Sequence, residues 1–407
     1  MHEAPSNRRR GRGPRRPIAS APVRNDAGAE SHPPVYAALD LGTNNCRLMI
    51  ASLHNGHFRI VEAFSRIVRL GEGLTHSGQL QDAAVERALK ALKICAEKIE
   101  KRGAARVRAV ATQACRIARN GQQFLNRVER ETGLKLSIIS PEEEARLAVM
   151  GCASLLEPRD LDPMPRAALV IDVGGGSTEL SWVEIEALQT EPQIAAAPQS
   201  APLSAQRSAQ LNALRAVRRA PRPRYWISMP VGVVTLAERF PEPRDGGFQD
   251  WFEAMVAAVT QEIRDFAAPE PLRPHFDAGA AYIVGTSGAI TSLAGMHLGL
   301  ERYDRSKVDG LWMGRDEVQG VIERLLHMGH AGREQEPCIG RDRADLVLAG
   351  AAILEAVQRL WPCQRLRVAD RGLREGLLLS MAKRKPKRRR RRKPAARREQ
   401  AEASVSS

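Results

Sequence analysis

The chain has 407 residues, enough for two or three domains of ordinary size, and its 43% apolar and 27% charged residues are the usual mix of a globular protein. Its six cysteines have neither C-x-x-C spacing nor a histidine cluster beside them, which argues against a disulfide scaffold or a zinc ribbon. No apolar run approaches the roughly 20 residues that span a bilayer. We therefore expect a cytoplasmic protein without a membrane segment.

The formal net charge of +15 is unevenly distributed. Residues 1–24 carry seven arginines and one glutamate, and residues 383–407 carry twelve lysines and arginines and two glutamates, so that 25–382 sums to −1. Both ends lack hydrophobic periodicity, and we expect disordered basic tails over 1–34 and 383–407. The C-terminal tail has no aromatic residues, so it is expected to bind polyanions such as nucleic acid or polyphosphate by electrostatic attraction.

Strands and helices alternate between the tails, which predicts an α/β protein. Strands are predicted, in chain order, at 35–40, 48–53, 58–64, 106–111, 136–139, 167–172, 179–185, 281–285 and 366–369. Helices are predicted at 82–101, 117–132, 141–157, 233–240, 248–267, 288–298, 315–328, 342–359 and 372–382. The Ala-, Gln-, Pro-, Ser- and Arg-rich segment 187–223 is predicted to be a flexible insertion, after which ordered sequence resumes at Tyr225.

Two segments of the chain share one design. In each, an apolar strand ends in an aspartate, and a glycine-rich turn, a hydroxyl side chain and an outgoing strand follow. The aspartates are Asp40 and Asp172, which lie 132 residues apart. A duplicated unit would place the two turns opposite each other across a cleft.

Three consecutive glycines, Gly174 to Gly176, follow Asp172. Glycine lets a backbone turn sharply and approach a ligand, and successive N–H groups can converge on anionic oxygens. Ser177 and Thr178 add hydroxyl donors, and Asp172 can hold a divalent cation. A tight hairpin without a ligand is the competing interpretation, but the flanking polar residues favour phosphate binding. The P-loop and the strand–G-x-G-x-x-G–helix pattern are both absent.

Further charged and polar residues lie next to predicted strands, and each allows two interpretations. Asp40 either forms a turn or completes a Mg²⁺ site with the aspartate before the glycine triplet. Arg116 either grips phosphate or lies on the surface. The acidic run 142–144 either compensates the dipole at a helix start or supplies a general base. Ser287 either caps a helix or binds an anion at its N-terminus.

Nine stretches, in this order, resemble the exopolyphosphatase/guanosine pentaphosphate phosphatase family (Ppx/GppA) of the actin–Hsp70–sugar-kinase superfamily. They are residues 39–45, 111–116, 139–146, 171–179, 229–238, 284–288, 303–310, 343–350 and 370–376. Each motif is modest by itself, but the nine in sequence cover roughly residues 35–380 and leave little room for coincidence.

The resemblance implies two actin-like (ribonuclease H-like) α/β domains, over 35–155 and 165–365, with the active site in the cleft between them. It also implies that a C-terminal strand and helix over 366–382 pack back on the core. The implied activity is hydrolysis of a phosphoanhydride, with release of the terminal phosphate from inorganic polyphosphate, guanosine pentaphosphate or both. The implied cofactor is Mg²⁺ or Mn²⁺, and because family members often form dimers, a homodimer is a further expectation.

The same resemblance assigns roles to individual residues. Glu143 would activate the attacking water, and the choice of Glu143 over its two neighbours rests on alignment alone. Arg116 would neutralise the transferred phosphate, and Asp172 would hold the metal with help from Asp40 and Glu179. The phosphate-binding residues would be Gly42, Thr43, Asn44, Gly174, Gly175, Gly176, Ser177, Thr178, Gly285 and Ser287.

The chain departs from the family pattern at three places. Asn45 stands where many members have serine, and Pro141 stands where many have glycine. The chain ends soon after Gly376, whereas long members carry further helical domains that help to bind long polyphosphate. Two rival functions stay open at this point: a kinase of the same superfamily that uses ATP, and a regulatory protein that binds polyanions.

Overall fold

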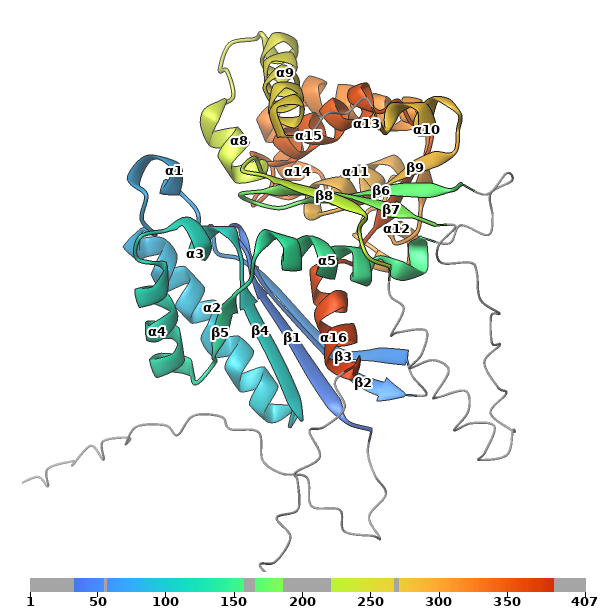
Figure 1. Cartoon of the computed structure of the whole chain (residues 1–407). Helices are drawn as coiled ribbons and strands as arrows, with labels where there is room; N and C mark the ends of the chain where they lie inside the picture. Colours follow the sequence, from blue (N-terminus) through green and yellow to red (C-terminus); the bar gives the residue numbers. More distant parts are fainter. Residues whose placement is uncertain (1–32, 55–56, 157–164, 186–220, 267–270, 384–407) are drawn as a thin grey trace, which may run out of the picture.

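The computed structural model describes residues 33–54, 57–156, 165–185, 221–266 and 271–383. These residues form two mixed β-sheets with helices on their faces (Figure 1), which confirms the expected α/β class. The expectations for 1–34, 187–223 and 383–407 concern segments that lie almost wholly outside the described residues. Within the described ranges, no helix combines the length and the apolar character that a membrane span requires.

The first sheet contains the N-terminal strands. They are β1 (Val35–Leu41), β2 (Asn45–His54), β3 (His57–Ile67), β4 (Arg106–Ala111) and β5 (Leu136–Ile138). Their order is β3-β2-β1-β4-β5. The first three strands form an antiparallel meander, and β4 and β5 run parallel to β1. The parallel pairs are joined through helices, as parallel strands require a crossover connection.

The second sheet repeats this arrangement. Its strands are β6 (Ala167–Val173), β7 (Thr178–Glu184), β8 (Tyr225–Met229), β9 (Ala281–Thr286), β10 (Trp312–Met313) and β11 (Leu366–Ala369). The order β8-β7-β6-β9-β11 and the strand directions match those of the first sheet, with β10 added antiparallel to β11. The internal repeat predicted from the sequence is therefore confirmed, and the turns after β1 and β6 occupy equivalent positions.

Helices cover the sheets of two structural units. We call residues 33–156, together with the last helix α16 (Leu373–Lys383), the first unit, and residues 165–369 the second unit. The other helices of the first unit are α1 (Leu74–Ser77), α2 (Asp82–Lys101), α3 (Gln113–Ile117), α4 (Gly121–Thr132) and α5 (Pro141–Gly151), followed by the 3₁₀ turn η1 (Ala153–Leu155). Those of the second unit are α8 (Val233–Arg239), α9 (Phe248–Phe266), α10 (Arg273–Asp277), α11 (Gly288–His297), α12 (Arg305–Val308), α13 (Arg315–His327), α14 (Gly329–Gln335) and α15 (Val347–Leu360).

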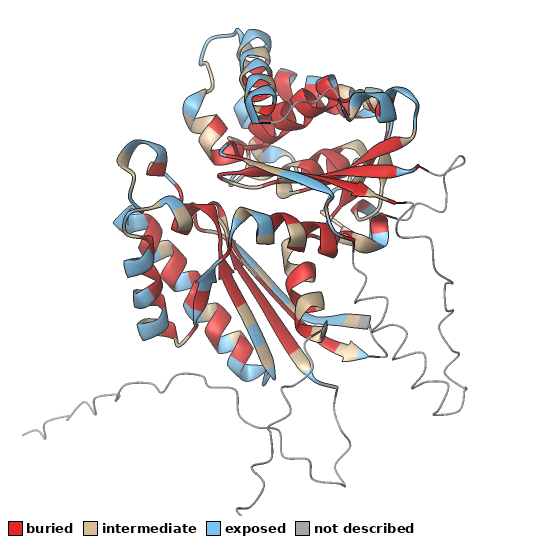
Figure 2. Ribbon diagram, viewed as in Figure 1, coloured by how far each residue is buried: buried red, intermediate tan, exposed pale blue. Residues whose placement is uncertain are grey.

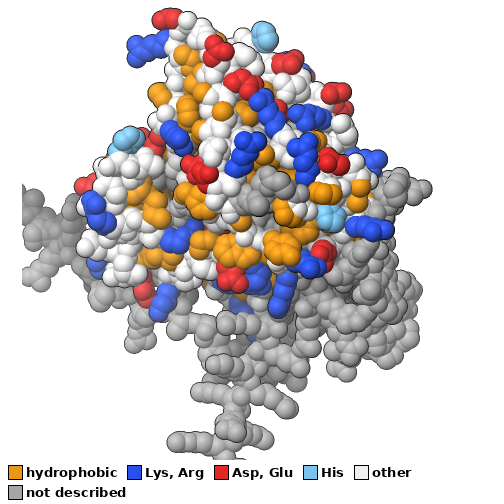
Figure 3. All heavy atoms as spheres, turned by 45° about the horizontal axis from the view of Figure 1, so that its top comes forward, with side chains coloured by type: hydrophobic (Ala, Val, Ile, Leu, Met, Phe, Trp, Pro, Cys, Tyr) orange, Lys and Arg blue, Asp and Glu red, His pale blue; other side chains and the backbone are white. Residues whose placement is uncertain are grey.

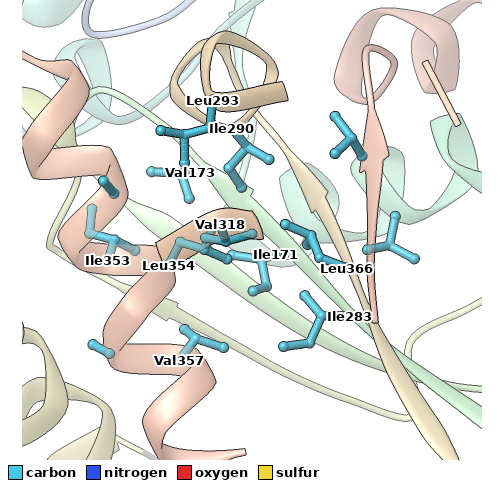
Figure 4. Close-up of a cluster of buried hydrophobic side chains, with 14 of the residues drawn as sticks. Ile171, Val173, Ile283, Ile290, Leu293, Val318, Ile353, Leu354, Val357 and Leu366 are labelled. Atoms are coloured by element: carbon cyan, nitrogen blue, oxygen red, sulfur yellow. The ribbon is translucent and has the colours of Figure 1, made fainter. Parts of the chain in front are cut away.

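Each sheet is packed on both faces. In the first unit, α2 and α4 bury their apolar stripes on one face, while their outer sides are exposed (Figure 2). In the second unit, Ile171 and Ile283 of the sheet pack against Ile353 and Val357 of α15 (Figure 4). Burial of these branched side chains removes apolar surface from water and fixes the strand ends that carry the polar turns.

The last helix returns to the first sheet. Strand β11 lies in the second sheet, but α16 crosses back and packs on α5 and β1, where Leu377 and Leu378 are buried. Glycines allow this close approach, because a Cβ on Gly151 would overlap the carbonyl oxygen of Gly372 and a Cβ on Gly376 would overlap that of Leu147. Consequently α5 and α16 lie between the two sheets (Figure 1).

Some predicted boundaries are wrong. The helix predicted at 117–132 begins only at Gly121, because the chain is extended at Ala118, and the preceding helix α3 is absent from the prediction. The helix predicted at 141–157 ends at Gly151, and the one predicted at 342–359 begins at Val347. The short elements α1, α10, α12, α14 and β10 were not predicted.

The described surface carries charges of both signs. On the face shown in Figure 3, basic and acidic side chains are interspersed. This pattern agrees with the sum of −1 over 25–382, so the excess positive charge belongs to the two ends of the sequence.

Candidate active site

The two glycine-bearing turns meet at the junction of the units. The turn 42–44 follows β1 and the turn 174–176 follows β6. A Cβ on Gly175 would lie 2.9 Å from the backbone nitrogen of Asn44, so only glycine lets the turns approach this closely. The side chain of Gln113, at the start of α3, donates a hydrogen bond of 3.0 Å to the carbonyl oxygen of Gly176 and ties the second turn to the first unit. The predicted juxtaposition of the two turns is therefore confirmed.

Helix α8 holds the second turn from the other side. The backbone nitrogens of Val233 and Val234 donate to the carbonyl oxygens of Gly174 and Gly175 at 3.0 and 2.8 Å. Gly232 packs so closely against this turn that a side chain would overlap it. The turn is thus fixed before any ligand binds, which reduces the ordering cost of binding.

Four carboxylates converge on the two turns. Asp40 ends β1, Asp172 lies near the end of β6, Glu179 lies on β7 and Glu144 lies on α5. Asp40, Glu144 and Glu179 are buried, and Asp172 is half-buried. Burial raises the pKa of all four groups, and neighbouring carboxylates raise it further for Asp172, to about 8, and for Glu144. Four carboxylates this close together are stable only if some of them are protonated or if a cation is bound between them.

Glu143 and Glu144 are adjacent on α5 but have different surroundings. Both oxygens of Glu143 are engaged by arginines: Arg146 donates to them at 2.7 Å and Arg108 donates to Oε1 at 2.8 Å. These ion pairs keep the pKa of Glu143 below its ordinary value. Glu144 instead faces the carboxylate cluster and is 8% exposed. The expectation that Glu143 is the general base therefore disagrees with its surroundings, and the inward-facing Glu144 takes its place as the candidate.

Arg116 lies where the sequence placed it, after β4 and next to the acidic turn. Its Nη1 donates to the carbonyl oxygen of Ile139 at 2.8 Å and contacts Oε2 of Glu144 at 3.2 Å. The guanidinium opposes the rise in the pKa of Glu144 that burial causes. Arg116 therefore lies beside the candidate base, within reach of an anion bound there.

Sequence reasoning missed three arginines of the site: Arg47, Arg343 and Arg374. Arg47 and Arg343 approach the same point, 3.6 Å (Nη2) and 3.9 Å (Cζ) from where a Cβ on Gly288 would lie. Burial and the charge of Arg374 lower the pKa of Arg47. Within the described residues, none of the three guanidiniums has a hydrogen bond or ion-pair partner. Half-buried guanidiniums without a partner in the described part of the chain have the chemistry to bind an anion.

A signal for Arg47 existed in the sequence. In the antiparallel hairpin of β1 and β2, Arg47 pairs directly with Asp40, so the register of a two-strand hairpin places both at the same site. Arg343 and Arg374 lie in two of the stretches that resemble the family, 343–350 and 370–376, but only the tertiary fold brings them close to Arg47.

Three of the predicted phosphate ligands make other interactions in the structure. The hydroxyl of Thr178 is fully buried and donates to the carbonyl oxygen of Val231 at 2.7 Å. The hydroxyl of Ser287 caps α11 by accepting from the nitrogen of Ile290 at 3.1 Å. Gly285 lies within β9, where a Cβ would meet the buried side chains of Ile290 and Leu366. The structure therefore does not support these three residues as phosphate ligands.

The remaining predicted ligands lie at the meeting point of the turns. Thr43 and Asn44 are buried against Gly175 and Gly176. Gly42 and Gly174 close their turns through backbone hydrogen bonds to Asn45 and Ser177. Ser177, which is 3% exposed, hydrogen-bonds to Glu179.

The donor chemistry of the site fits a hard divalent cation. Three buried oxygens at the turn after β1 have no hydrogen-bond partner among the residues that the structure describes: Oδ1 of Asp40, of Asn44 and of Asn45. Carboxylate and amide oxygens are the ligands that Mg²⁺ prefers, together with water and substrate phosphate. In the described part of the chain, no three Asp, Glu, His or Cys side chains come close enough to enclose a metal by themselves. The residues thus fit an ion that completes its coordination with phosphate and water.

Comparison with known proteins agrees with this architecture. A model of the Ppx/GppA phosphatase family matches residues 49–212 and 214–385. The solved structure of the Aquifex aeolicus member of that family is 27% identical, covers 86% of this chain and 97% of its own, and gives a TM-score of 0.63. A solved exopolyphosphatase-like protein is 28% identical over 86% of this chain and 98% of its own, with a TM-score of 0.68. An exopolyphosphatase from Cytophaga hutchinsonii, 20% identical over 86% of this chain and 97% of its own, shares the fold with a TM-score of 0.67.

Proposed function

Because the chain belongs to the Ppx/GppA phosphatase family and has its two-unit, actin-like fold, we propose that it hydrolyses a phosphoanhydride bond. The proposed reaction releases the terminal phosphate of inorganic polyphosphate or guanosine pentaphosphate. The observation that carries the proposal is the position of Glu144, a buried carboxylate that faces the two glycine turns beside Arg116. Phosphoryl transfer to water needs a group that accepts a proton next to bound phosphate, and this arrangement supplies it.

Glu144 suits the role of general base because of its surroundings. Burial and the neighbouring Glu179 raise its pKa, which makes it a stronger proton acceptor than an exposed glutamate. Arg116 lies 3.2 Å from one oxygen of Glu144 and supports the ionised form of the carboxylate. In the proposed step, Glu144 takes the proton of the attacking water while the backbone N–H groups of the glycine turns hold the phosphate oxygens.

Asp172 and Asp40, with Glu179 in support, would hold the divalent cation, Mg²⁺ or Mn²⁺. When bound, such a cation neutralises charge on the phosphate oxygens and orients them. A serine fixes the orientation of Glu179: the hydroxyl of Ser228 donates to Oε1 of Glu179 at 2.8 Å.

The unpartnered arginines support a substrate with several phosphates. A single terminal phosphate would be satisfied by the glycine turns and Arg116. Arg47, Arg343 and Arg374 add three positive charges close to one another, with no partner among the described residues. Such a surplus of guanidiniums matches a chain of phosphates better than a phosphomonoester.

The test is phosphate release by the purified full chain with Mg²⁺. We would offer guanosine pentaphosphate, long polyphosphate and p-nitrophenyl phosphate, a monoester control. Release from one or both of the first two substrates, but not from the monoester, is expected, and chelation of Mg²⁺ should abolish it. Asp172→Asn should abolish release as well, whereas Asp245→Asn, at an exposed position, should leave it unchanged. Equal release from the monoester, or full activity of Asp172→Asn, would contradict the proposal.

A further inference from the structure

A segment of the first unit connects the first glycine turn to the second unit. We name residues 68–75, which follow β3 and run into α1, the strap. The strap hydrogen-bonds to the first glycine turn: the nitrogen of Arg69 donates to the carbonyl oxygen of Asn44 at 3.0 Å, and that of Gly71 donates to Thr43 at 2.9 Å. A movement of the strap is therefore transmitted directly to this turn.

The first bridge from the strap to the second unit is an ion pair. Arg69 binds both carboxylate oxygens of Asp345, at 2.8 and 3.2 Å, and also donates to the carbonyl oxygen of Asp342 at 3.3 Å. Its φ of 44° makes it the one non-glycine residue of the described chain in the left-handed region. Surrounding contacts must maintain this conformation, because it is unfavourable for a side chain of this size. Asp345 is two residues from the site residue Arg343.

The second bridge is made by Glu238 of α8. One carboxylate oxygen accepts from the nitrogen of Gly73 at 2.9 Å, and the other accepts from the hydroxyl of Thr75 at 2.7 Å. Figure 1 shows α1 beside α8 at this edge of the molecule. The first turn of α8 is the element that holds the glycine turn 174–176. The strap thus connects the first glycine turn, through Glu238 and α8, to the second.

We propose that Arg69 and Glu238 are positioning residues that hold the two glycine turns face to face, so that the strap keeps the units closed over the substrate. The proposal rests on the function proposed above. The first unit's described residues end at 156 and those of the second begin at 165, and the chain returns to the first unit at 369–373. The strap adds non-covalent bridges between the units. Loss of the bridges lowers the population of the closed arrangement. Apparent affinity falls in proportion to that population, whereas turnover at saturation, where substrate itself closes the units, is preserved.

The experiment measures the distance between the units without substrate. Spin labels are placed on cysteines introduced at the exposed helical positions Gln123 and Asp250; all six native cysteines are buried. The test variant combines Asp345→Ala with Glu238→Ala. The matched control is Glu253→Ala, which removes an ion pair within the second unit. That pair, Arg359–Glu253, has side-chain exposures of 39% and 40%, against 36% and 37% for Arg69–Asp345.

The proposal predicts a broader distance distribution that extends to longer distances in the test variant, and an unchanged one in the control. It also predicts about a three- to tenfold rise in KM for the substrate, with kcat and the thermal unfolding midpoint matching the control. In a protein that carries Asp345→Arg, the second substitution Arg69→Asp re-forms the ion pair with its charges exchanged. It should restore the distance distribution of the unaltered protein. An unchanged distribution in the test variant would overturn the proposal. Because the distances are measured without turnover, this outcome is separate from failure of the proposed function, which would appear as no phosphate release by the unaltered protein.

Discussion

Neighbouring glutamates at the start of α5 face different surroundings because successive helical residues point about 100° apart. Ser140 caps the helix by accepting from the nitrogen of Glu143 at 3.2 Å, and this cap fixes the rotation of the first turn. Glu143 then lies one turn from Arg146, while Glu144 lies over the buried Leu147. The sequence contained both signals, an i,i+3 ion pair and an apolar i+3 neighbour, and together they assign Glu144 to the inner face.

At the same scale, Asp172 makes the stability of the ligand-free protein depend on pH. Its pKa rises from the ordinary 3.8 to about 8 on folding, through burial and nearby carboxylates. Between these values the folded protein binds more protons than the unfolded chain, so its stability falls as pH rises. We predict that Asp172→Asn loses less free energy of unfolding between pH 5 and pH 8.5 than the unaltered protein, measured by urea denaturation with a chelator present.

The control for this prediction is Asp245→Asn, which alters an exposed carboxylate. The free energy of unfolding of Asp245→Asn should equal that of the unaltered protein at both pH 5 and pH 8.5. Some pH dependence should persist in Asp172→Asn, because burial also raises the pKa of Asp40, Glu144 and Glu179. An identical loss of stability in Asp172→Asn and the unaltered protein would show that Asp172 is not the group responsible.

At the scale of the element, the contact of α5 with α16 depends on small residues. Gly151→Ala would place a methyl group on the carbonyl oxygen of Gly372, so the start of α16 must shift away from α5. We predict a loss of about 1–3 kcal/mol in the free energy of unfolding, the usual cost of overpacking, measured by urea denaturation.

Gly320→Ala on the exposed side of α13 is the matched control. Nothing lies within 4 Å of its added methyl group, and alanine favours helix over glycine by about 0.5–1 kcal/mol. This variant should therefore be stabilised. If both variants changed stability by the same amount and sign, the loss in Gly151→Ala would not reflect packing of α5 on α16.

Elements with long periodic patterns were predictable, and short ones were not. The helix 82–101 and the strand 106–111 match the structure at both ends because their apolar positions repeat over several turns or residues. Helices such as α1 and α12 contain four residues each, which is too few to show a period. Such short helices are stabilised by tertiary contacts rather than by their own propensity.

At the scale of the whole molecule, the site forms where two copies of one topology meet. The aspartate–glycine repeat predicted this meeting, because equivalent turns of duplicated units face each other. The repeat could not predict Arg343 or Arg374, since these residues approach Arg47 from segments with no counterpart in the repeat. The same holds for Asp345 and Glu238, whose bridges to the strap depend on how the units pack.

The account depends most on Glu144, because the choice of base determines how the site activates water. The most direct measurement compares phosphate release from guanosine pentaphosphate and polyphosphate by Glu144→Gln and by Glu143→Gln. Glutamine keeps the size of each side chain but does not accept the proton. We predict that Glu144→Gln lowers kcat by about 10²–10⁴-fold, whereas Glu143→Gln stays within a few-fold of the unaltered protein. Loss of release in Glu143→Gln together with near-normal release in Glu144→Gln would contradict the account.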